Sequence, residues 1–158
     1  MYKKDIKISR RAFVLLLSFL GFSIPAFSQS LVTFNKSKLS IMTSTGIRNF
    51  VVEMAVSDQQ QSQGLMYRRS MVANAGMLFD YSTLRHIQMW MKNTYIPLDM
   101  IFIDRHGRII NIVERTIPHS EAIIASKGPA RAVLELNSGA ASRFGIKTGD
   151  TVSHSIFR

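Results

Sequence analysis

Short apolar runs alternate with clusters of turn residues from about residue 38 onward. This alternation is typical of a mainly β domain, in which each strand is short and a turn follows it. Many strands at this spacing in one small domain predict a single compact antiparallel β-barrel-like domain with one or two short helices. The expected strands cover residues 40–43, 49–55, 76–81, 87–93, 98–104, 108–114, 130–136 and 151–157.

Two short segments carry the signals of helices. Ser57 can cap a helix over residues 58–63, and Gln60 stands where it would complete a capping box. Gly64 is positioned to end that helix, since glycine accepts the backbone angles of a helix terminus. Residues 138–144 can form one or two further helical turns.

The first 28 residues differ from the rest of the chain. A basic opening precedes an almost uninterrupted apolar run over residues 12–24, and small residues follow at Ala26 and Ser28. The run is shorter than the ~20 apolar residues that a membrane span requires. We therefore expect residues 1–28 to be a signal peptide that is cleaved after Ser28. The mature protein is then periplasmic or secreted, with no stable membrane anchor after cleavage.

The export route stays open between two readings. Arg10 and Arg11 stand just before the apolar run and fit a twin-arginine signal, whose route carries folded proteins. An ordinary secretory signal also has a basic end. The strong hydrophobicity of the run, and the absence of a basic residue between it and the cleavage site, favour the ordinary route.

The part of the chain after the signal peptide is long enough for one domain. Residues 29–37 are polar and are expected to form a flexible N-terminal segment, and residues 38–158 the single β-rich domain. A chain of this length buries enough apolar surface for a single core. No internal repeat or low-complexity tract divides it.

Charge and cysteine content exclude several classes of protein. The chain has 20 Lys and Arg against 10 Asp and Glu, a formal net charge of +10, of which +6 remains after residue 28. The remaining basic residues are scattered, whereas nucleic-acid binding needs a concentrated basic patch with aromatic side chains for stacking. There is no cysteine, so disulfides, thiolate metal sites and lipoprotein acylation are excluded.

The most distinctive chemistry lies in residues 89–103, which we predict to form a hairpin. In the register that a four-residue loop imposes, Lys92 faces Asp99, and Met91 and Met100 lie on the opposite face. An ion pair among large apolar side chains is typical of a concave site, although it is also what a structural ion pair looks like.

Three functions remain open for this face. The first is an exported envelope module, not an enzyme, that binds a small ligand or a protein partner. The alternative is a small hydrolase or lyase that acts on cell-wall or sugar material, with Asp99 as acid or base. No catalytic residue can be named beyond that candidate. The candidate ligand-binding residues are Arg68, Trp90, Lys92, Asn93 and Asp99.

A second alternative is copper handling by methionine. Thioether sulfurs are soft ligands that suit Cu(I). However, methionine is also a common core residue, and the four histidines are too far apart in sequence for a metal pair. We therefore expect no metal site and no cofactor. The methionines concerned are Met66, Met71, Met77, Met89, Met91 and Met100.

Several short motifs together resemble the bacterial and archaeal family called domain of unknown function 192. The motifs are Val52–Ala55, Gly64–Arg68, Gly76–Phe79, Trp90–Thr94, Ile96–Asp99, Ile101–Asp104, Val133–Leu136 and Gly149–Asp150. The resemblance covers residues 38–157 and implies a compact, mainly β domain that is often exported. It implies no established reaction, substrate or cofactor. Tyr67 stands where the family usually has phenylalanine.

Overall fold

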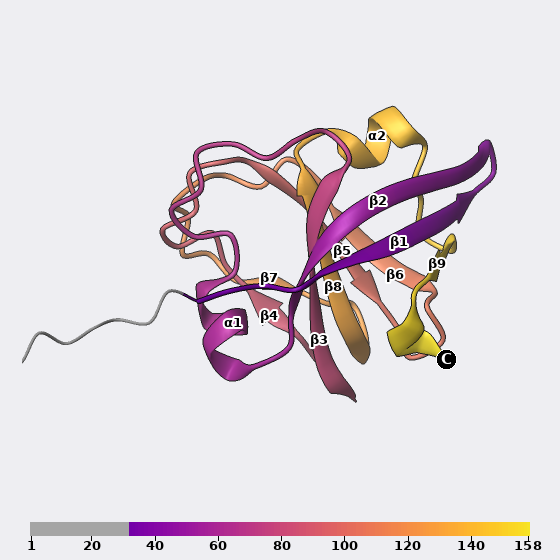
Figure 1. The fold of residues 1–158 in the computed structure, drawn as a ribbon, viewed down its shortest axis with the longest axis horizontal. Helices are drawn as coiled ribbons and strands as arrows, with labels where there is room; N and C mark the ends of the chain where they lie inside the picture. The colour runs from indigo at the N-terminus through magenta and orange to yellow at the C-terminus, as the bar shows by residue number, and fades with distance from the viewer. Residues whose placement is uncertain (1–31) are drawn as a thin grey trace, which may run out of the picture. The chain divides into compact units, whose positions relative to one another are not determined.

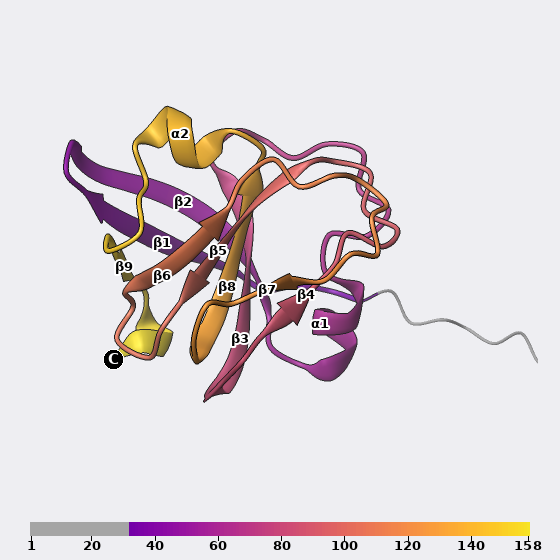
Figure 2. The ribbon, with the colours of Figure 1, turned by 180° about the vertical axis from the view of Figure 1, so that it is seen from behind.

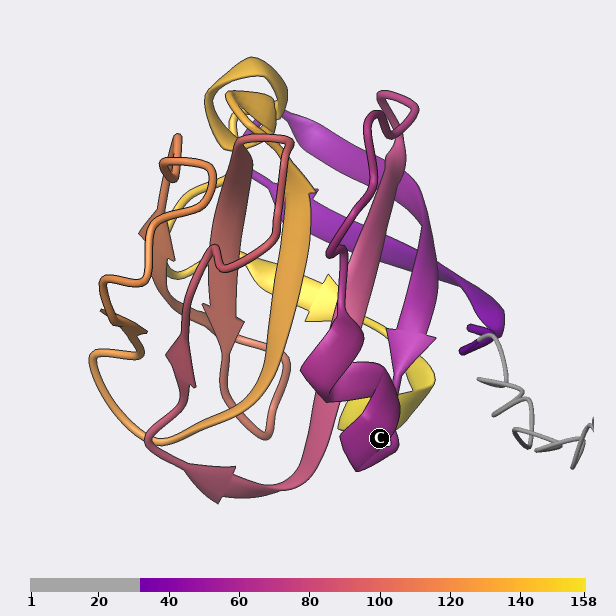
Figure 3. The ribbon, with the colours of Figure 1, turned by 90° about the vertical axis from the view of Figure 1, so that its left-hand side faces the viewer.

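The computed structural model describes residues 32–158, so the expected signal peptide lies outside the described residues. Within them a curled seven-stranded sheet forms a half-barrel, with strand order β6-β5-β8-β3-β2-β1-β9 (Figures 1 and 3). A two-stranded sheet, β4-β7, lies apart from it. The strands are β1 (Lys36–Thr43), β2 (Gly46–Ala55), β3 (Ala75–Arg85), β4 (Gln88–Met89), β5 (Leu98–Ile103), β6 (Ile109–Val113), β7 (Ile124–Ala125), β8 (Ala130–Asn137) and β9 (Thr151–Ser153).

The helices are short and end where the sequence signals them. Helix α1 (Asp58–Gln63) begins with the expected capping box: the Ser57 hydroxyl accepts from the Gln60 N–H, and the Gln60 side chain accepts from the Ser57 N–H. Helix α2 (Ala140–Phe144) follows β8, and a 3-10 turn, η1 (Ser155–Phe157), follows β9. No helix in residues 32–158 is both long and apolar enough to cross a membrane.

The predicted mainly β fold is confirmed, with one ladder of the opposite sense. Strands β2 and β3 are parallel, because the chain crosses over between them through α1. The other ladders of the seven-stranded sheet are antiparallel. Strand β1 begins at Lys36, two residues inside the segment that was expected to be flexible, and Phe34 already packs against the core.

Backbone hydrogen bonds link the two edges of the curled sheet. The segment before β6 meets β9, where Arg108 and Thr151 form an isolated bridge. The Val152 N–H donates to the Gly107 carbonyl at 2.7 Å. Gly107 has φ +81°, and a Cβ there would lie 2.4 Å from the Val152 oxygen, so only glycine allows this approach. The curl is thus closed at this end.

The central strands are buried on both faces, which produces two hydrophobic cores. The inner core lies in the curl of the sheet and includes Ile41, Leu78 and Leu134. The outer core lies on the opposite face and includes Met77, Phe79 and Met100. Figures 1 and 2 show α1 and the loops that join α1 to β3, β4 to β5 and β6 to β7 gathered on one side of the sheet.

Candidate functional site

The predicted hairpin over residues 89–103 is wrong. Met89 ends the two-residue strand β4 and pairs with Ile124, not with a residue of β5. Asp99 in β5 pairs with Leu136 of β8. The residues between β4 and β5 form a loop, and their alternation of polar and apolar side chains does not reflect a strand. Lys92 and Asp99 are therefore not cross-strand neighbours, and the pairing of Met91 with Met100 is lost with the same register.

Asp99 is fully buried and supports the backbone. Its carboxylate accepts hydrogen bonds from the N–H groups of Arg115, Gly139 and Ala141, at 2.9, 3.0 and 2.9 Å. Gly139 is the N-cap of α2 and has no side chain to cap the helix, so Asp99 supplies that cap from a neighbouring strand. With no exposed surface, Asp99 has no route to a ligand and does not belong to a binding face.

Lys92 pairs with a different acid. Its Nζ lies 3.5 Å from Glu121, in an exposed salt bridge, and 5.2 Å from the centroid of the Trp90 ring. Such an exposed pair contributes little to stability. The Trp90 side chain is itself 46% exposed, which is high for the only tryptophan in the chain.

Asn93 lies in a loop that is held to its neighbours by backbone hydrogen bonds. The Asn93 carbonyl accepts from the Tyr67 N–H at 2.9 Å, and the Asn93 amide donates to the Tyr67 hydroxyl at 3.0 Å. Both residues have positive φ, 55° and 66°. Asparagine tolerates positive φ, but for a tyrosine it is costly and persists only where the surroundings enforce it. The loops are therefore well defined next to Trp90.

Arg68 makes its contacts on another side of this region. Its guanidinium forms a two-pronged salt bridge with Glu53 and lies 5.7 Å from the Phe34 ring centroid. The hydrogen bond to Glu53 raises the pKa of Arg68 above its ordinary value. The five predicted site residues therefore do not form one site, and of these only Trp90 lines a cleft.

That cleft lies over the outer core and has a volume of about 180 Å³. Helix α1 and the residues after it form one wall, and β3, β4 and Trp90 form the others. Gly64 shapes the α1 wall: it has φ +48°, and a Cβ there would lie 2.9 Å from the Phe79 ring. The lining residues are Gln61, Ser62, Gln63, Gly64, Leu65, Met66, Phe79, Tyr81, Gln88, Met89, Trp90, Thr94 and Glu135.

Glu135 is the unusual member of this lining. It lies in the middle of β8, where its cross-strand neighbours are Met77 on one side and Met100 on the other. It is 4% exposed. Nine polar residues are buried among residues 32–158, and Glu135 alone among them makes no side-chain hydrogen bond there. A buried polar group without a partner is costly and calls for an explanation.

The Glu135 carboxyl reaches the surface of the cleft. No fully enclosed side-chain oxygen or nitrogen in the described residues lacks a hydrogen bond, so the unpaired Glu135 oxygens must touch the cleft. Burial raises the pKa of Glu135 to about 8, and at neutral pH the group is mostly protonated. Burial also raises the pKa of Tyr81, the other titratable lining residue, to about 12.

Sequence reasoning missed Glu135 as a site residue. Residues 133–136 were read only as part of a strand and of the family pattern. The available signal was a single acidic residue flanked by Leu134 and Leu136 in an otherwise apolar run. A strand buried on both faces has no solvated side for a carboxylate, so such a residue must find a partner or a cleft.

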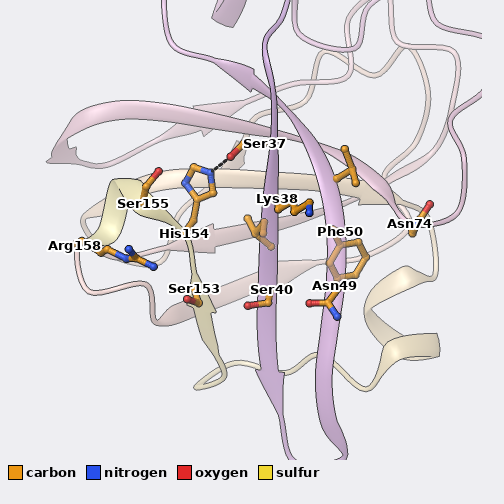
Figure 4. Close-up of a pocket in the computed structure, with 12 residues that line it drawn as sticks. Ser37, Lys38, Ser40, Asn49, Phe50, Asn74, Ser153, His154, Ser155 and Arg158 are labelled. Atoms are coloured by element: carbon orange, nitrogen blue, oxygen red, sulfur yellow. Dashed lines mark hydrogen bonds between the residues drawn. The ribbon is translucent and has the colours of Figure 1, made fainter.

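A larger hollow of about 610 Å³ lies over β1, β2 and β9 (Figure 4). Here His154 Nε2 lies 2.8 Å from the Ser37 hydroxyl, and the Ile156 N–H donates to His154 Nδ1 at 3.3 Å. Since Nδ1 accepts, Nε2 carries the proton and cannot take one from Ser37, so this pair is not an activated nucleophile. Burial lowers the pKa of His154, which keeps the ring neutral.

The described residues contain no cluster of three histidine, aspartate or glutamate side chains that could hold a metal ion. Two methionine sulfurs line the cleft, and each has a hydrogen-bond donor close by. The Tyr81 hydroxyl donates to Met89 Sδ at 3.2 Å, and the Asn93 amide lies 3.9 Å from Met66 Sδ. These contacts orient the sulfurs as part of the cleft wall.

Comparisons with known proteins agree with the motifs. A structure from Sinorhizobium meliloti 1021, given as that of a candidate transcription regulator, has 46% sequence identity over 80% of this chain and 99% of that one, with a TM-score of 0.78. A protein of unknown function from Novosphingobium aromaticivorans DSM 12444 has 35% identity over 78% and 89% of the two chains, with a TM-score of 0.76. No curated protein matches. Residues 40–154 match the profile of DUF192, described as an uncharacterised conserved family, and the chain belongs to that family.

Proposed function

We propose that this protein is an exported envelope module that binds a small ligand in the cleft over Glu135. One observation carries the proposal: a buried carboxyl without a hydrogen-bond partner opens onto a cleft walled by aromatic and thioether side chains. Binding sites are typically apolar concavities with few polar groups that fix orientation. A ligand group that pairs with Glu135 would remove the cost of leaving the carboxyl unpaired.

The cleft is favoured over the larger hollow because of what each contains. The hollow is lined mainly by exposed polar side chains of strands, and its one buried polar residue, His154, already has partners at both ring nitrogens. Solvent satisfies the rest. Only the cleft contains a buried polar group whose partner is still to be supplied.

Binding is favoured over hydrolysis because Glu135 stands alone. Hydrolysis of glycosides uses two carboxyl groups on either side of the scissile bond. The described lining of the cleft holds no second acid, no histidine and no lysine. Asp99, the residue first considered as acid or base, is committed to three backbone N–H groups. A single protonated carboxyl is suited to orienting a bound group.

Export rests on the N-terminal sequence. A basic opening, an apolar run and a small-x-small site precede Gln29, as in cleaved signal peptides. N-terminal sequencing of the protein from its native host should find Gln29 in the periplasmic or secreted fraction. Recovery of the chain with Met1 from the cytosol would contradict export without touching the cleft.

The ligand-binding proposal is tested by thermal shift with defined probe classes. The probes are amines, alcohols, amides, carboxylates and simple sugars at pH 7, together with Cu(I) under anaerobic conditions. A ligand that binds only the folded state raises the melting temperature. At least one organic class should stabilise the wild-type protein and Glu114→Gln, an exposed acid-to-amide control, but not Glu135→Gln.

Three results would contradict the proposal. The first is stabilisation that is equal in Glu135→Gln and the wild type. The second is stabilisation lost only in Lys38→Gln, which would place the site in the larger hollow. The third is stabilisation by Cu(I) alone, lost on replacing Met66 and Met89 by leucine, which would favour metal handling by methionine.

A further inference from the structure

Apart from the phenol of Tyr81, Glu135 is the only acidic or basic side chain in the described lining of the cleft. Lysine, arginine, histidine and aspartate are absent from that lining. A ligand carboxylate or phosphate would therefore meet another acid and no basic side chain within the lining, at a site where water screens poorly. A ligand cation would meet the one group in the cleft that lacks a partner.

The walls of the cleft also favour a cation. Trp90 and Tyr81 present aromatic rings, whose faces attract positive charge. Each ring already contacts a positively charged side chain of the protein. The Arg85 guanidinium lies 4.1 Å from the centroid of the Tyr81 ring, and Lys92 Nζ lies 5.2 Å from the centroid of the Trp90 ring. The Lys92 charge is compensated by Glu121, and Arg85 is an exposed residue whose charge is screened by solvent, so neither side chain opposes a bound cation strongly.

The hydrogen-bonding groups around the carboxyl indicate a donor-rich ligand. Gln61 Nε2 is committed to the carbonyls of Ala55 and Asp80, at 3.4 and 2.8 Å, which leaves its side-chain oxygen as an acceptor. The Thr94 hydroxyl donates to the Lys92 carbonyl. A primary ammonium has three N–H donors and no acceptor, and it matches such a set.

The volume limits the size of the inserted group. About 180 Å³ is the space of roughly six waters at ~30 Å³ each. This accepts an amino group with a short aliphatic stem, whose methylenes would contact Met66 and Met89. A group much larger than this would have to project out of the cleft into solvent.

We propose that the Glu135 cleft binds a primary alkylammonium group, with the Glu135 carboxylate as its counter-ion and Trp90 and Tyr81 as its aromatic walls. This inference rests on the proposed ligand-binding function and names the ligand class. The chemistry is shared by a free alkylamine and by a lysine side chain of a peptide. When binding occurs well below pH 8, Glu135 gives its proton to solvent and the ligand ammonium keeps its own, so about one proton is released for each ligand bound.

The test is isothermal titration calorimetry with three probes of the same length: n-butylammonium, 1-butanol and butyrate. Wild-type protein should bind n-butylammonium most tightly, at least tenfold over the other two. Since burial raises the pKa of Glu135 to about 8, affinity should rise about tenfold per pH unit between pH 6 and 7 and level off by pH 9. Titration in buffers of different ionisation enthalpy should show about one proton released at pH 6.5 and almost none at pH 9.

Variants and a second ligand complete the test. Glu135→Gln should lose at least tenfold in affinity for n-butylammonium and lose the pH dependence, while Glu114→Gln retains both. The melting temperature of Glu135→Gln at pH 5, where Glu135 of the wild type is neutral, should stay close to that of the wild type. This agreement would show that the variant folds correctly. N-acetyl-lysine methylamide distinguishes the sources: tighter binding than n-butylammonium indicates a peptide side chain, and weaker binding a free amine.

The outcomes separate this inference from the proposed function. Equal or tighter binding of 1-butanol or butyrate in the cleft, with no proton release, would overturn the ammonium assignment and leave a ligand cleft. If no probe of any class shifts the NMR resonances of Trp90 or of β8, the proposed function fails as well.

Discussion

The carboxylate of Asp99 in β5 accepts a hydrogen bond from the backbone N–H of Gly139, the N-cap residue of α2, at 3.0 Å. A second oxygen of the same carboxylate takes the N–H of Ala141. The helix therefore starts where a strand remote in sequence supplies its cap. This relationship explains why an acid that resembles a catalytic residue in the sequence is a structural one in the fold.

Asp99→Asn should destabilise the protein by about 2–4 kcal/mol, because a buried carboxylate with three N–H donors is replaced by a group that offers an N–H₂ to one of them. Urea denaturation measures this. Asp104→Asn is the control, since that carboxylate accepts two backbone N–H groups in a more accessible turn and should cost about 1 kcal/mol or less. Comparable losses in both variants would show that Asp99 has no special role in the core.

Glu135 should make stability fall as pH rises. Its pKa is about 8 in the folded protein and 4.5 as the unperturbed value, so the folded state holds a proton that the unfolded state has lost between these limits. The contribution of Glu135 to the free energy of unfolding is fully present below pH 4.5 and is lost as the pH rises through 8. The total loss is up to about 5 kcal/mol.

The comparison with Glu135→Gln isolates this effect. Other groups contribute equally to both proteins, so the difference between their unfolding free energies from pH 5 to pH 9 reports Glu135. The unfolding free energy of the variant relative to the wild type should increase from pH 5 to about pH 8 and then level off. A difference that does not change with pH would mean that Glu135 is not buried as a neutral acid.

Trp90→Ala should affect binding more than stability. The side chain is 46% exposed, so its removal should change the unfolding free energy by only about 1 kcal/mol. Loss of the aromatic wall should weaken ligand binding in the cleft about tenfold. Tyr95→Ala is a matched control, with a 41% exposed ring that does not line the cleft. Equal losses of binding affinity in the two variants would indicate that the ligand binds on the loop surface and not in the cleft.

Gly64→Ala should destabilise the protein by about 1–3 kcal/mol. The residue has φ +48°, and the new methyl group would press on the Phe79 ring. Gly128→Ala, where nothing lies within 4 Å of the added carbon, should cost under about 1 kcal/mol. Thermal unfolding of the pair measures the difference, and similar melting temperatures would show that the α1 wall yields to accommodate a side chain.

The elements with local signals could be predicted from the sequence. The capping box at Ser57 and Gln60 uses contacts only three residues apart, so α1 was found with its exact start. The alternation of short apolar runs with turn residues was also enough to predict a mainly β fold. The partners of the strands were not readable, since β5 pairs with β8 and β6 and not with the segment just before it. Pairing over long sequence separations depends on the whole fold.

The candidate site residues were predicted to lie together and do not, for the same reason. Lys92 and Asp99 are close in sequence and complementary in charge, yet one lies on an exposed loop with Glu121 and the other is enclosed beside α2. Trp90 was expected in a depression shared with the other candidate residues, and in the fold it lines a cleft without them. Glu135 joins Trp90 only through the packing of β8 behind α1 and β4, which no local pattern encodes.

The most direct measurement is the NMR titration of the Glu135 side-chain carboxyl, labelled with ¹³C and assigned by comparison with Glu135→Gln. A buried carboxyl that opens onto the cleft without a partner should titrate near pH 8, and saturating n-butylammonium should lower that midpoint by more than one pH unit. A midpoint near 4.5, unchanged by the ligand, would show a solvated carboxylate and would contradict both the buried site and its assignment as a binding cleft.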